Sequence, residues 1–479
     1  MSRPLCLPPP STALLAVVTV LAGISAADPP RPNFVVILAD DLGIGDVSAY
    51  RQADVRTPGI DRLAAEGMRF TSMRSNGTVC SPARAALLTG RYPDRVGVPG
   101  VIRTDPDNSW GHFDPSVPTL ADELRAVGYH TAIIGKWHLG LVSPNVPNDR
   151  GFDHFHGFLG DMMESYTTHR RHGDNLMRLD GDTIDPSGHA TDLFTEWAIA
   201  YLRERAATPE RPFFLYLAYN APHFPIEPPE EWVASVRTRL PALDERRARS
   251  VAFVEHFDHG VGRVLDALAE EGLDRTTLIV FTSDNGGSLP HAQNNDPWRG
   301  GKQDHYDGGL RVPFLVRLPG TVKPGSTSDH VGLSFDVVPT FLELAGRPCP
   351  PDIDAVTLLP ALRGETATTD DRRELYFTRR EGGPAYGGRS YEAIVRGRWK
   401  LMQNHPYGPL ELYDLAADPY ERTDLAATRR DVVKELSFTL QRHVQRGGSI
   451  PWQPPPSEVH ASQSRSRPGR TSPVRASPP

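Results

Sequence analysis

Five short apolar segments, separated by stretches with helical periodicity, constrain the fold of this chain more than any other feature. They cover residues 34–38, 131–134, 213–217, 278–281 and 312–316, and each has the length and apolar character of a strand buried on both faces. Helical patterns lie between them, among others at 60–68, which Thr57 and Pro58 precede, and at 250–268. Alternating strands and helices predict an α/β domain built on a large mixed, mostly parallel sheet that is flanked by helices.

Polar side chains follow four of the five predicted strands within a few positions. In chain order they are Asp40 with Asp41, Lys136 with His138, His223, and Asp284 with Asn285. Ligands of open α/β sheets bind where the carboxyl ends of the strands meet. We therefore expect these side chains to form one site.

The chain carries a pattern typical of export. Within residues 1–27, Arg3 precedes an apolar stretch at 13–24 and then small residues that end at Ala27, which is the pattern of a secretory signal peptide. No later segment approaches the roughly 20 apolar residues of a membrane span. The sequence predicts a periplasmic or secreted protein without a membrane span.

Cysteine and charge composition exclude several classes of protein. After loss of Cys6 with the signal peptide, Cys80 and Cys349 are left, which form either one bridge or two free thiols and not a disulfide framework. A net charge of −7 gives no global reason to bind nucleic acid. Only five of the 52 cationic residues are lysines, so each lysine indicates that a compact point charge is favoured there.

The second part of the chain predicts a smaller domain. A helix that ends near Gly346 closes the large domain, which we place at residues 28–345. Patterns at 393–402 and 412–415 indicate a small antiparallel sheet, and 431–442 indicates a final helix, within a domain at 346–447. Residues 448–479 are rich in Pro, Ser and Arg, and we expect a disordered tail.

One motif carries a family resemblance. Cys80-Ser81-Pro82-Ala83-Arg84, followed by Leu87-Leu88-Thr89-Gly90-Arg91, resembles the C-x-P-x-R signature of the sulfatase family and its downstream L-T-G-R block. The blocks around Asp40, Lys136, His223, Asp284 and Lys302 come in the family's order, and the resemblance is strongest to the arylsulfatase A and N-acetylgalactosamine-6-sulfatase type. It implies an alkaline phosphatase-like fold and a formylglycine made from Cys80 by a formylglycine-generating or sulfatase-modifying enzyme.

The resemblance also implies a catalytic set, which consists of Cys80, Arg84, Lys136, His138, His223 and Lys302. Cleavage of a sulfate ester requires a nucleophile, neutralisation of the sulfate charge and a proton for the leaving oxygen. The hydrated aldehyde from Cys80 would attack sulfur, and Arg84, four residues further along a helix that we expect Ser81 to cap, would hold it. Lys136 and Lys302 would neutralise the sulfate. His138 would take the proton that drives sulfate release, and His223 would protonate the leaving alcohol.

Oxygen ligands predict the cofactor. Asp40, Asp41, Asp284 and Asn285 offer only oxygen, which suits a hard divalent cation, and we expect Ca²⁺, with Mg²⁺ as the alternative. Cys80 completes the expected ligand set. Either acidic pair alone would also fit a helix cap or a solvent-facing turn.

Three sequence features qualify the resemblance. Asp307 stands before Gly308-Gly309 where the family commonly has a glutamate, and Ser165 is a loose match to a serine that contacts sulfate in some members. Asn76 begins a glycosylation sequon, which we expect to be unused because it lies beside Cys80.

The predicted substrate is a sulfated small molecule or glycan, and two other functions compete with sulfate ester hydrolysis. One is a phosphodiesterase or phosphonate monoester hydrolase of the same superfamily, which would share the metal site. The other is a non-catalytic protein that binds sulfated glycans. The complete catalytic set favours the enzyme, and the arylsulfatase-type blocks favour sulfate.

Overall fold

The structure is a computed structural model that describes residues 31–51, 54–105, 108–365, 372–381, 389–405 and 408–448. The predicted signal peptide lies outside the described residues, as does the predicted tail apart from Gly448. Within the described residues, no helix combines the length and the apolar character that crossing a bilayer requires.

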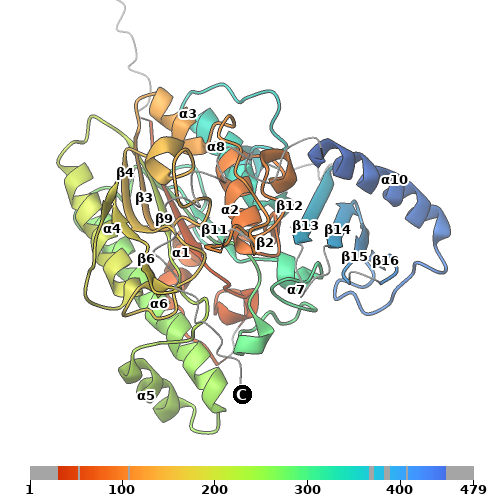
Figure 1. Cartoon of the computed structure of the whole chain (residues 1–479), viewed down its shortest axis with the longest axis horizontal. Coiled ribbons are helices and arrows are strands. Elements are labelled where there is room, and N and C mark those ends of the chain that lie inside the picture. The colour runs from red at the N-terminus through yellow and green to blue at the C-terminus, as the bar shows by residue number, and fades with distance from the viewer. Residues whose placement is uncertain are drawn as a thin grey trace, which may run out of the picture. The chain divides into compact units, whose positions relative to one another are not determined.

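A mixed sheet of ten strands is the centre of the fold (Figure 1). Its order is β12-β2-β11-β10-β1-β9-β3-β4-β7-β8, and the five neighbours from β10 to β4 are parallel. The strand β11 is antiparallel to both of its neighbours, and β7 and β8 form an antiparallel edge. The strands are β1 Asn33–Ala39, β2 Met68–Arg74, β3 His130–Lys136, β4 His154–Phe158, β7 Met177–Leu179, β8 Asp182–Thr183, β9 Phe213–Ala218, β10 Thr277–Ser283, β11 Phe314–Arg317 and β12 Ser326–Leu333.

Helices cover both faces of this sheet, so its central strands are buried on both sides. Successive residues of β1 enter opposite cores: Val35 and Ile37 pack into one, and Phe34 and Val36 into the other. The first core is closed by α1 Pro58–Glu66, α4 Ala190–Ala206, α5 Glu230–Arg239 and α6 Glu245–Glu270. The second is closed by α2 Cys80–Thr89, α3 Leu120–Ala126, α8 Val337–Leu344 and α9 Leu359–Leu362.

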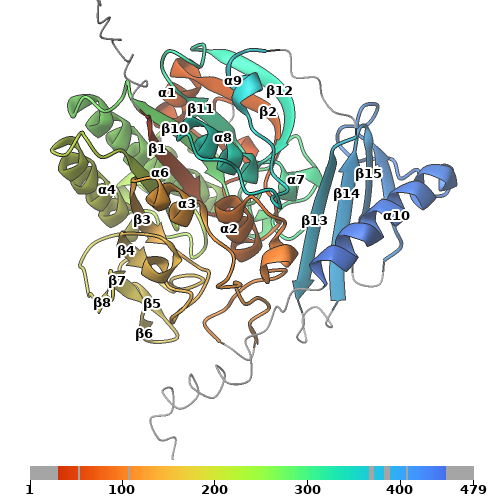
Figure 2. The same cartoon turned by 90° about the horizontal axis from the view of Figure 1, so that it is seen from above.

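A second, antiparallel sheet of four strands lies beside α10 Arg430–Gly447 (Figure 2). Its strands are β13 Glu374–Glu381, β14 Arg389–Arg396, β15 Trp399–Gln403 and β16 Glu411–Asp414. A third core joins this sheet and α10 to residues of the first part of the chain, including Ala86 of α2. The two sheets are therefore packed together through apolar side chains. A short hairpin, β5 Arg170–Arg171 with β6 Asp174–Asn175, completes the strands.

The predicted fold class is confirmed, and two local expectations are wrong. The helix predicted at 60–68 ends at Glu66, and Met68 already begins β2. Gly67 between them packs against β11, since a Cβ added to it would lie 2.3 Å from the Val316 carbonyl oxygen. Ser81 does not cap α2, which begins one residue earlier at Cys80 with Val79 as its cap. The Ser81 hydroxyl instead accepts the N–H of Ile102.

Candidate active site

The carboxyl ends of four parallel strands bring the predicted polar residues together. Asp40 and Asp41 follow β1, Lys136 ends β3, His223 follows β9, and Asp284 follows β10. The backbone holds these ends in register, since Asp40 N–H donates to the Ala221 carbonyl and Asp284 N–H to the Ala39 carbonyl. The predicted convergence on one edge of the sheet is thus found in the structure.

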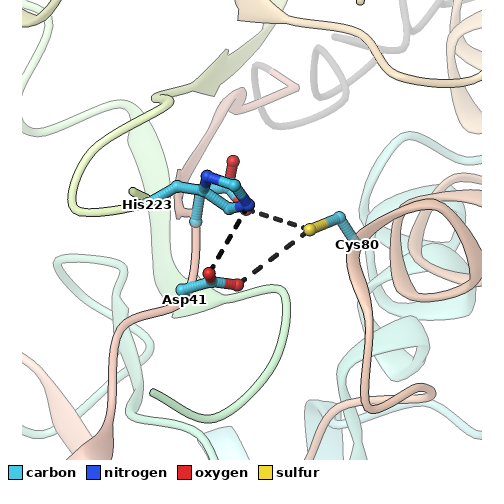
Figure 3. Close-up of side chains that lie close together, drawn as sticks. Asp41, Cys80 and His223 are labelled. Atoms are coloured by element: carbon cyan, nitrogen blue, oxygen red, sulfur yellow. Dashed lines mark hydrogen bonds and ion pairs between the residues drawn. The ribbon is translucent and has the colours of Figure 1, made fainter. Parts of the chain in front are cut away.

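Cys80 faces this edge from the first turn of α2. Figure 3 shows its sulfur directed toward Asp41 and His223. The thiol donates to Oδ1 of Asp40 at 3.2 Å and lies 3.9 Å from Nζ of Lys302. Burial, and then the charges of Asp284 and Asp40, raise the pKa of this thiol well above its usual value. The unmodified side chain is therefore a neutral thiol and a weak nucleophile.

Asp40 is fully buried among cations. Its Oδ2 lies 2.5 Å from Nζ of Lys136 and 3.6 Å from Nη2 of Arg84. Burial alone would raise the pKa of Asp40, but Lys136, and after it His223 and Arg84, hold that pKa well below its usual value. Asp40 is consequently an anion.

Asp41, which lies beside Cys80, also contacts two predicted catalytic residues, Lys302 and His223. Its Oδ2 lies 2.7 Å from Nζ of Lys302 and 3.6 Å from Nε2 of His223. The other nitrogen of His223, Nδ1, pairs with the Phe224 carbonyl at 2.6 Å, so that Nε2 is the atom directed to the site. Burial and Lys302 lower the pKa of His223 to about 4.

Arg84 lies between the carboxylates of Asp40 and Asp284. Its Nε donates to Oδ2 of Asp284 at 3.0 Å, and its Nη1 donates to the Lys136 carbonyl at 3.1 Å. Burial and the negative charge of Asp40 raise the pKa of Asp284 to about 7. Arg84 thus contacts the carboxylates, and the helix α2 sets its position relative to Cys80.

His138 is buried with one ring nitrogen free of a partner. Its Nε2 pairs with the Ile102 carbonyl at 2.7 Å and therefore donates, while Nδ1 has no hydrogen-bond partner among the described residues. Burial and the charge of Lys136 lower the pKa of His138 well below its usual value. The ring is a neutral imidazole with an available lone pair, which is the form of a general base.

The donor set fits a hard cation. Asp40, Asp41, Cys80 and His223 place ligand atoms within 4.8 Å of one another. Asn285 Nδ2 donates to Oδ1 of Asp41, whereas Oδ1 of Asn285 is buried without a partner among the described residues. A buried oxygen without a hydrogen-bond partner is unfavourable, and a divalent cation bound by this Asn285 oxygen and the neighbouring carboxylates would satisfy it.

The structure does not bring every candidate to this cluster. The Ser165 hydroxyl pairs with that of Thr167 at 3.0 Å, and no contact joins it to the cluster among the described residues. The neighbouring Tyr166 is the residue that supports the site, since its hydroxyl contacts the carbonyls of Asn220 and His223.

Cys80 and Cys349 are both free, so the alternative of one bridge is wrong.

Sequence reasoning did not identify other supporting residues. Ser283 accepts the N–H of Leu42 after the Asp40-Asp41 pair, and only its place beside Asp284 signalled a role. Asn76 of the sequon is fully buried, and its carbonyl oxygen accepts from the Ser334 hydroxyl and the Phe335 N–H. The folded chain therefore does not expose Asn76 to a glycosylating enzyme.

Family models match almost the whole described chain. The model described as Sulfatase matches residues 32–347. The model described as N-sulphoglucosamine sulphohydrolase, C-terminal, matches residues 301–446.

Similar curated proteins are sulfatases of comparable length. The chain is 33% identical to an N-acetylgalactosamine-6-sulfatase of Canis lupus familiaris over 498 residues, covering 92% of this chain and 91% of the relative. It is 31% identical to a steryl-sulfatase of Mus musculus, covering 92% and 88% of the two chains.

Solved structures agree with the described fold. The crystal structure of Ps i-CgsB in complex with k-i-k-neocarrahexaose has a TM-score of 0.80 and 29% identity, and the match covers 92% of this chain and 98% of that one. A phosphonate monoester hydrolase of Agrobacterium radiobacter has a TM-score of 0.65 at 23% identity, covering 88% and 96%, which supports the fold alone. The expected alkaline phosphatase-like architecture is confirmed.

Proposed function

The chain belongs to the sulfatase family and is a sulfuric ester hydrolase, and from this membership we propose a formylglycine-dependent, metal-assisted hydrolysis of sulfated carbohydrates. The observation that carries the proposal is the position of Cys80, whose sulfur lies within reach of Asp40 and Lys302. Relatives named for N-acetylgalactosamine 6-sulfate, and a solved neighbour in complex with a neocarrahexaose, support a sugar as the carrier of the sulfate.

The nucleophile in this proposal is the hydrated aldehyde that a maturation enzyme makes from Cys80. It supplies one hydroxyl for attack on sulfur and a second through which sulfate leaves without hydrolysis at sulfur. The unmodified thiol, whose pKa is raised by burial, would be a poor nucleophile at this position, which favours a modified residue as the attacking group. Arg84 lies on the same helix and holds the carboxylates in place around it.

Two histidines move protons in the proposed reaction. His223 must be protonated on both nitrogens for this step, a form that the negative charges of Asp41 and Asp40 favour, and it then donates from Nε2 to the oxygen of the leaving alcohol as the sulfur–oxygen bond breaks. Its Nδ1 contact with the Phe224 carbonyl fixes the ring for that step. His138 removes the proton of the second hydroxyl through its unpartnered Nδ1, and the Ile102 carbonyl holds its other nitrogen.

Charges of the chain bind the sulfate. Lys302 is partly accessible, while Lys136 is fully buried against Asp40. The three cations Arg84, Lys136 and Lys302 offset the carboxylates of Asp40, Asp41 and Asp284. A divalent ion held by these carboxylates, Asn285 and the modified residue 80 would add positive charge for an anionic ester and would polarise a sulfate oxygen. We propose Ca²⁺, with Mg²⁺ as the alternative.

The proposal includes export to the periplasm or the exterior, on the sequence pattern of residues 1–27. It also includes an encounter with the maturation enzyme before folding, because Cys80 is buried in the folded chain.

A comparison of ester classes tests the proposed function. Wild-type protein from a host that makes formylglycine should release sulfate from 4-nitrophenyl sulfate faster than phosphate from 4-nitrophenyl phosphate or its diester. Lys302→Ala should lose most of the sulfatase activity, whereas Lys323→Ala, at an exposed lysine, serves as the matched control. Faster cleavage of the phosphate diester would favour the phosphodiesterase alternative, and no hydrolysis of any ester would favour a glycan-binding protein.

A further inference from the structure

Two loops beside the nucleophile position form one connected wall. The loop after β9 carries His223, and the loop after β10 contains the short 3-10 helix η5, Leu289–His291. The buried Gln293 joins them, since its Nε2 donates to the Pro222 carbonyl at 2.9 Å and its Oε1 accepts the N–H of Ser288. The position of η5 is therefore tied to that of His223.

Three stacked rings run outward from the site along this wall. Phe224 stacks on His223 with ring centroids 4.5 Å apart, and His291 stacks on Phe224 at the same spacing with an interplanar angle of 9°. Nζ of Lys302 lies 6.0 Å from the Phe224 ring centroid. His291 thus lies two ring spacings from the proposed proton donor on the same wall.

The ring of His291 is held in place and has one nitrogen available. Its Nδ1 pairs with the Ser288 hydroxyl at 2.8 Å, while no described residue forms a hydrogen bond with its Nε2, and the ring is partly exposed. Arg246 and Arg247 of α6 donate to the carbonyls of Pro290 and Ala292 on either side. A fixed ring with a free nitrogen loses little conformational entropy when it binds a ligand.

His291 lies beside residues that also border Lys302. Both Lys302 and the ring of His291 lie against Phe224, since Nζ of Lys302 is 6.0 Å from the Phe224 ring centroid on which His291 stacks. Leu289, in the same turn, leaves 50% of its surface exposed and lies next to Gly301, the residue before Lys302. The same turn therefore carries an exposed apolar side chain and a partly exposed histidine.

We propose that His291 determines specificity by binding, through Nε2, a hydroxyl of the sugar ring that carries the sulfate ester. The inference rests on the proposed function and adds a residue that selects the leaving group. A sugar ring offers hydroxyls to Nε2 and C–H groups to Leu289, whereas a simple aryl sulfate offers no hydroxyl. A site that is built to hydrogen-bond a hydroxyl discriminates strongly against a ligand that lacks it.

Kinetics with two substrates test this assignment. We would compare N-acetylgalactosamine 6-sulfate with 4-nitrophenyl sulfate, in the wild type and in His291→Ala, His291→Phe and His291→Gln. Phe keeps the ring stacked on Phe224 without a polar atom, and Gln keeps a polar group near the position of Nε2. His259→Ala, at an exposed histidine of α6, is the matched control, and thermal unfolding checks that each variant is folded.

The expected result is a split between substrates. Ala and Phe at position 291 should raise KM for the sugar sulfate about tenfold and leave 4-nitrophenyl sulfate turnover within about twofold of wild type, and Gln should restore part of the loss. Equal losses for both substrates, or no loss for either, would overturn the assignment. So would a wild type that cleaves 4-nitrophenyl sulfate but neither cleaves the sugar sulfate nor is inhibited by it. A wild type that cleaves neither contradicts the proposed function itself.

Discussion

Lys400 of β15 pairs with Asp307 of α7, Asp307–Leu310, across 2.9 Å, and both side chains are fully buried. Nζ of Lys400 also lies 2.6 Å from Glu421, and Arg74 donates two hydrogen bonds to Asp307. Two residues after Asp307, the carbonyl of Gly309 accepts the N–H of Gly286, which follows Asn285. The four-stranded sheet therefore braces the loop that carries two proposed metal ligands.

Removal of this lysine should destabilise the protein. Lys400→Met leaves the buried carboxylates of Asp307 and Glu421 without one cation, and breaking a buried pair costs about 3–5 kcal/mol. We expect a lower midpoint of thermal unfolding than in Lys434→Met, which alters an exposed lysine of α10. Glu421→Gln combined with Lys400→Met should recover part of the loss. Equal midpoints for the two single variants would show that the pair contributes nothing to stability.

Asp94 should make stability depend on pH. It lies in the 3-10 helix η2, Pro93–Val96, with one oxygen 3.1 Å from the Tyr376 hydroxyl and 3.4 Å from Arg380. Burial raises the pKa of Asp94 to about 6, although Arg380 opposes the shift. The folded state therefore holds the proton more tightly than the unfolded state, and the free energy of unfolding should fall as pH rises from about 4 to about 6.

The variant Asp94→Asn removes this titration. Its midpoint of thermal unfolding, relative to wild type, should be higher at about pH 7 than at about pH 4.5, by an amount equivalent to at most about 3 kcal/mol. Asp182→Asn, at an exposed position of β8, should show no such trend. A constant difference between Asp94→Asn and wild type at both pH values would contradict the shifted pKa.

Metal removal should abolish turnover. Asp40, Asp41, Asp284 and Asn285 surround the site, and the orphaned oxygen of Asn285 lacks a partner among the described residues. Chelation followed by elemental analysis should yield inactive protein, and added Ca²⁺ or Mg²⁺ should restore activity. Full activity in verifiably metal-free protein would exclude the proposed cation.

The strand ends, and with them most of the site, could be predicted because they depend on local patterns. Apolar runs of strand length, each followed by a polar residue, fix which side chains meet at a parallel edge. The start of α2 was mispredicted because Ser81 resembles a cap, whereas its hydroxyl is used by Ile102 from another loop.

Contacts between distant segments were beyond sequence reasoning. Asp307 was noted only as a departure from a family pattern, and Lys400 only as a rare lysine, yet 93 residues of chain separate the two partners. The stacking of His291 on Phe224 likewise depends on where two loops lie. The domain boundaries near 345 and 447 stay predictions.

The measurement that tests the central claim most directly is mass spectrometry of the peptide spanning residues 75–84, treated with an aldehyde-reactive probe and paired with sulfate release. In a competent host, active protein should carry an aldehyde at position 80, while exposed Cys349 in the same sample keeps its thiol as an internal control. Cys80→Ala should lose nearly all turnover, Cys80→Ser should turn over very poorly because it has one hydroxyl, and Cys349→Ser should match wild type. Fully active protein with only a thiol at Cys80, or wild-type turnover in Cys80→Ala, would contradict the mechanism.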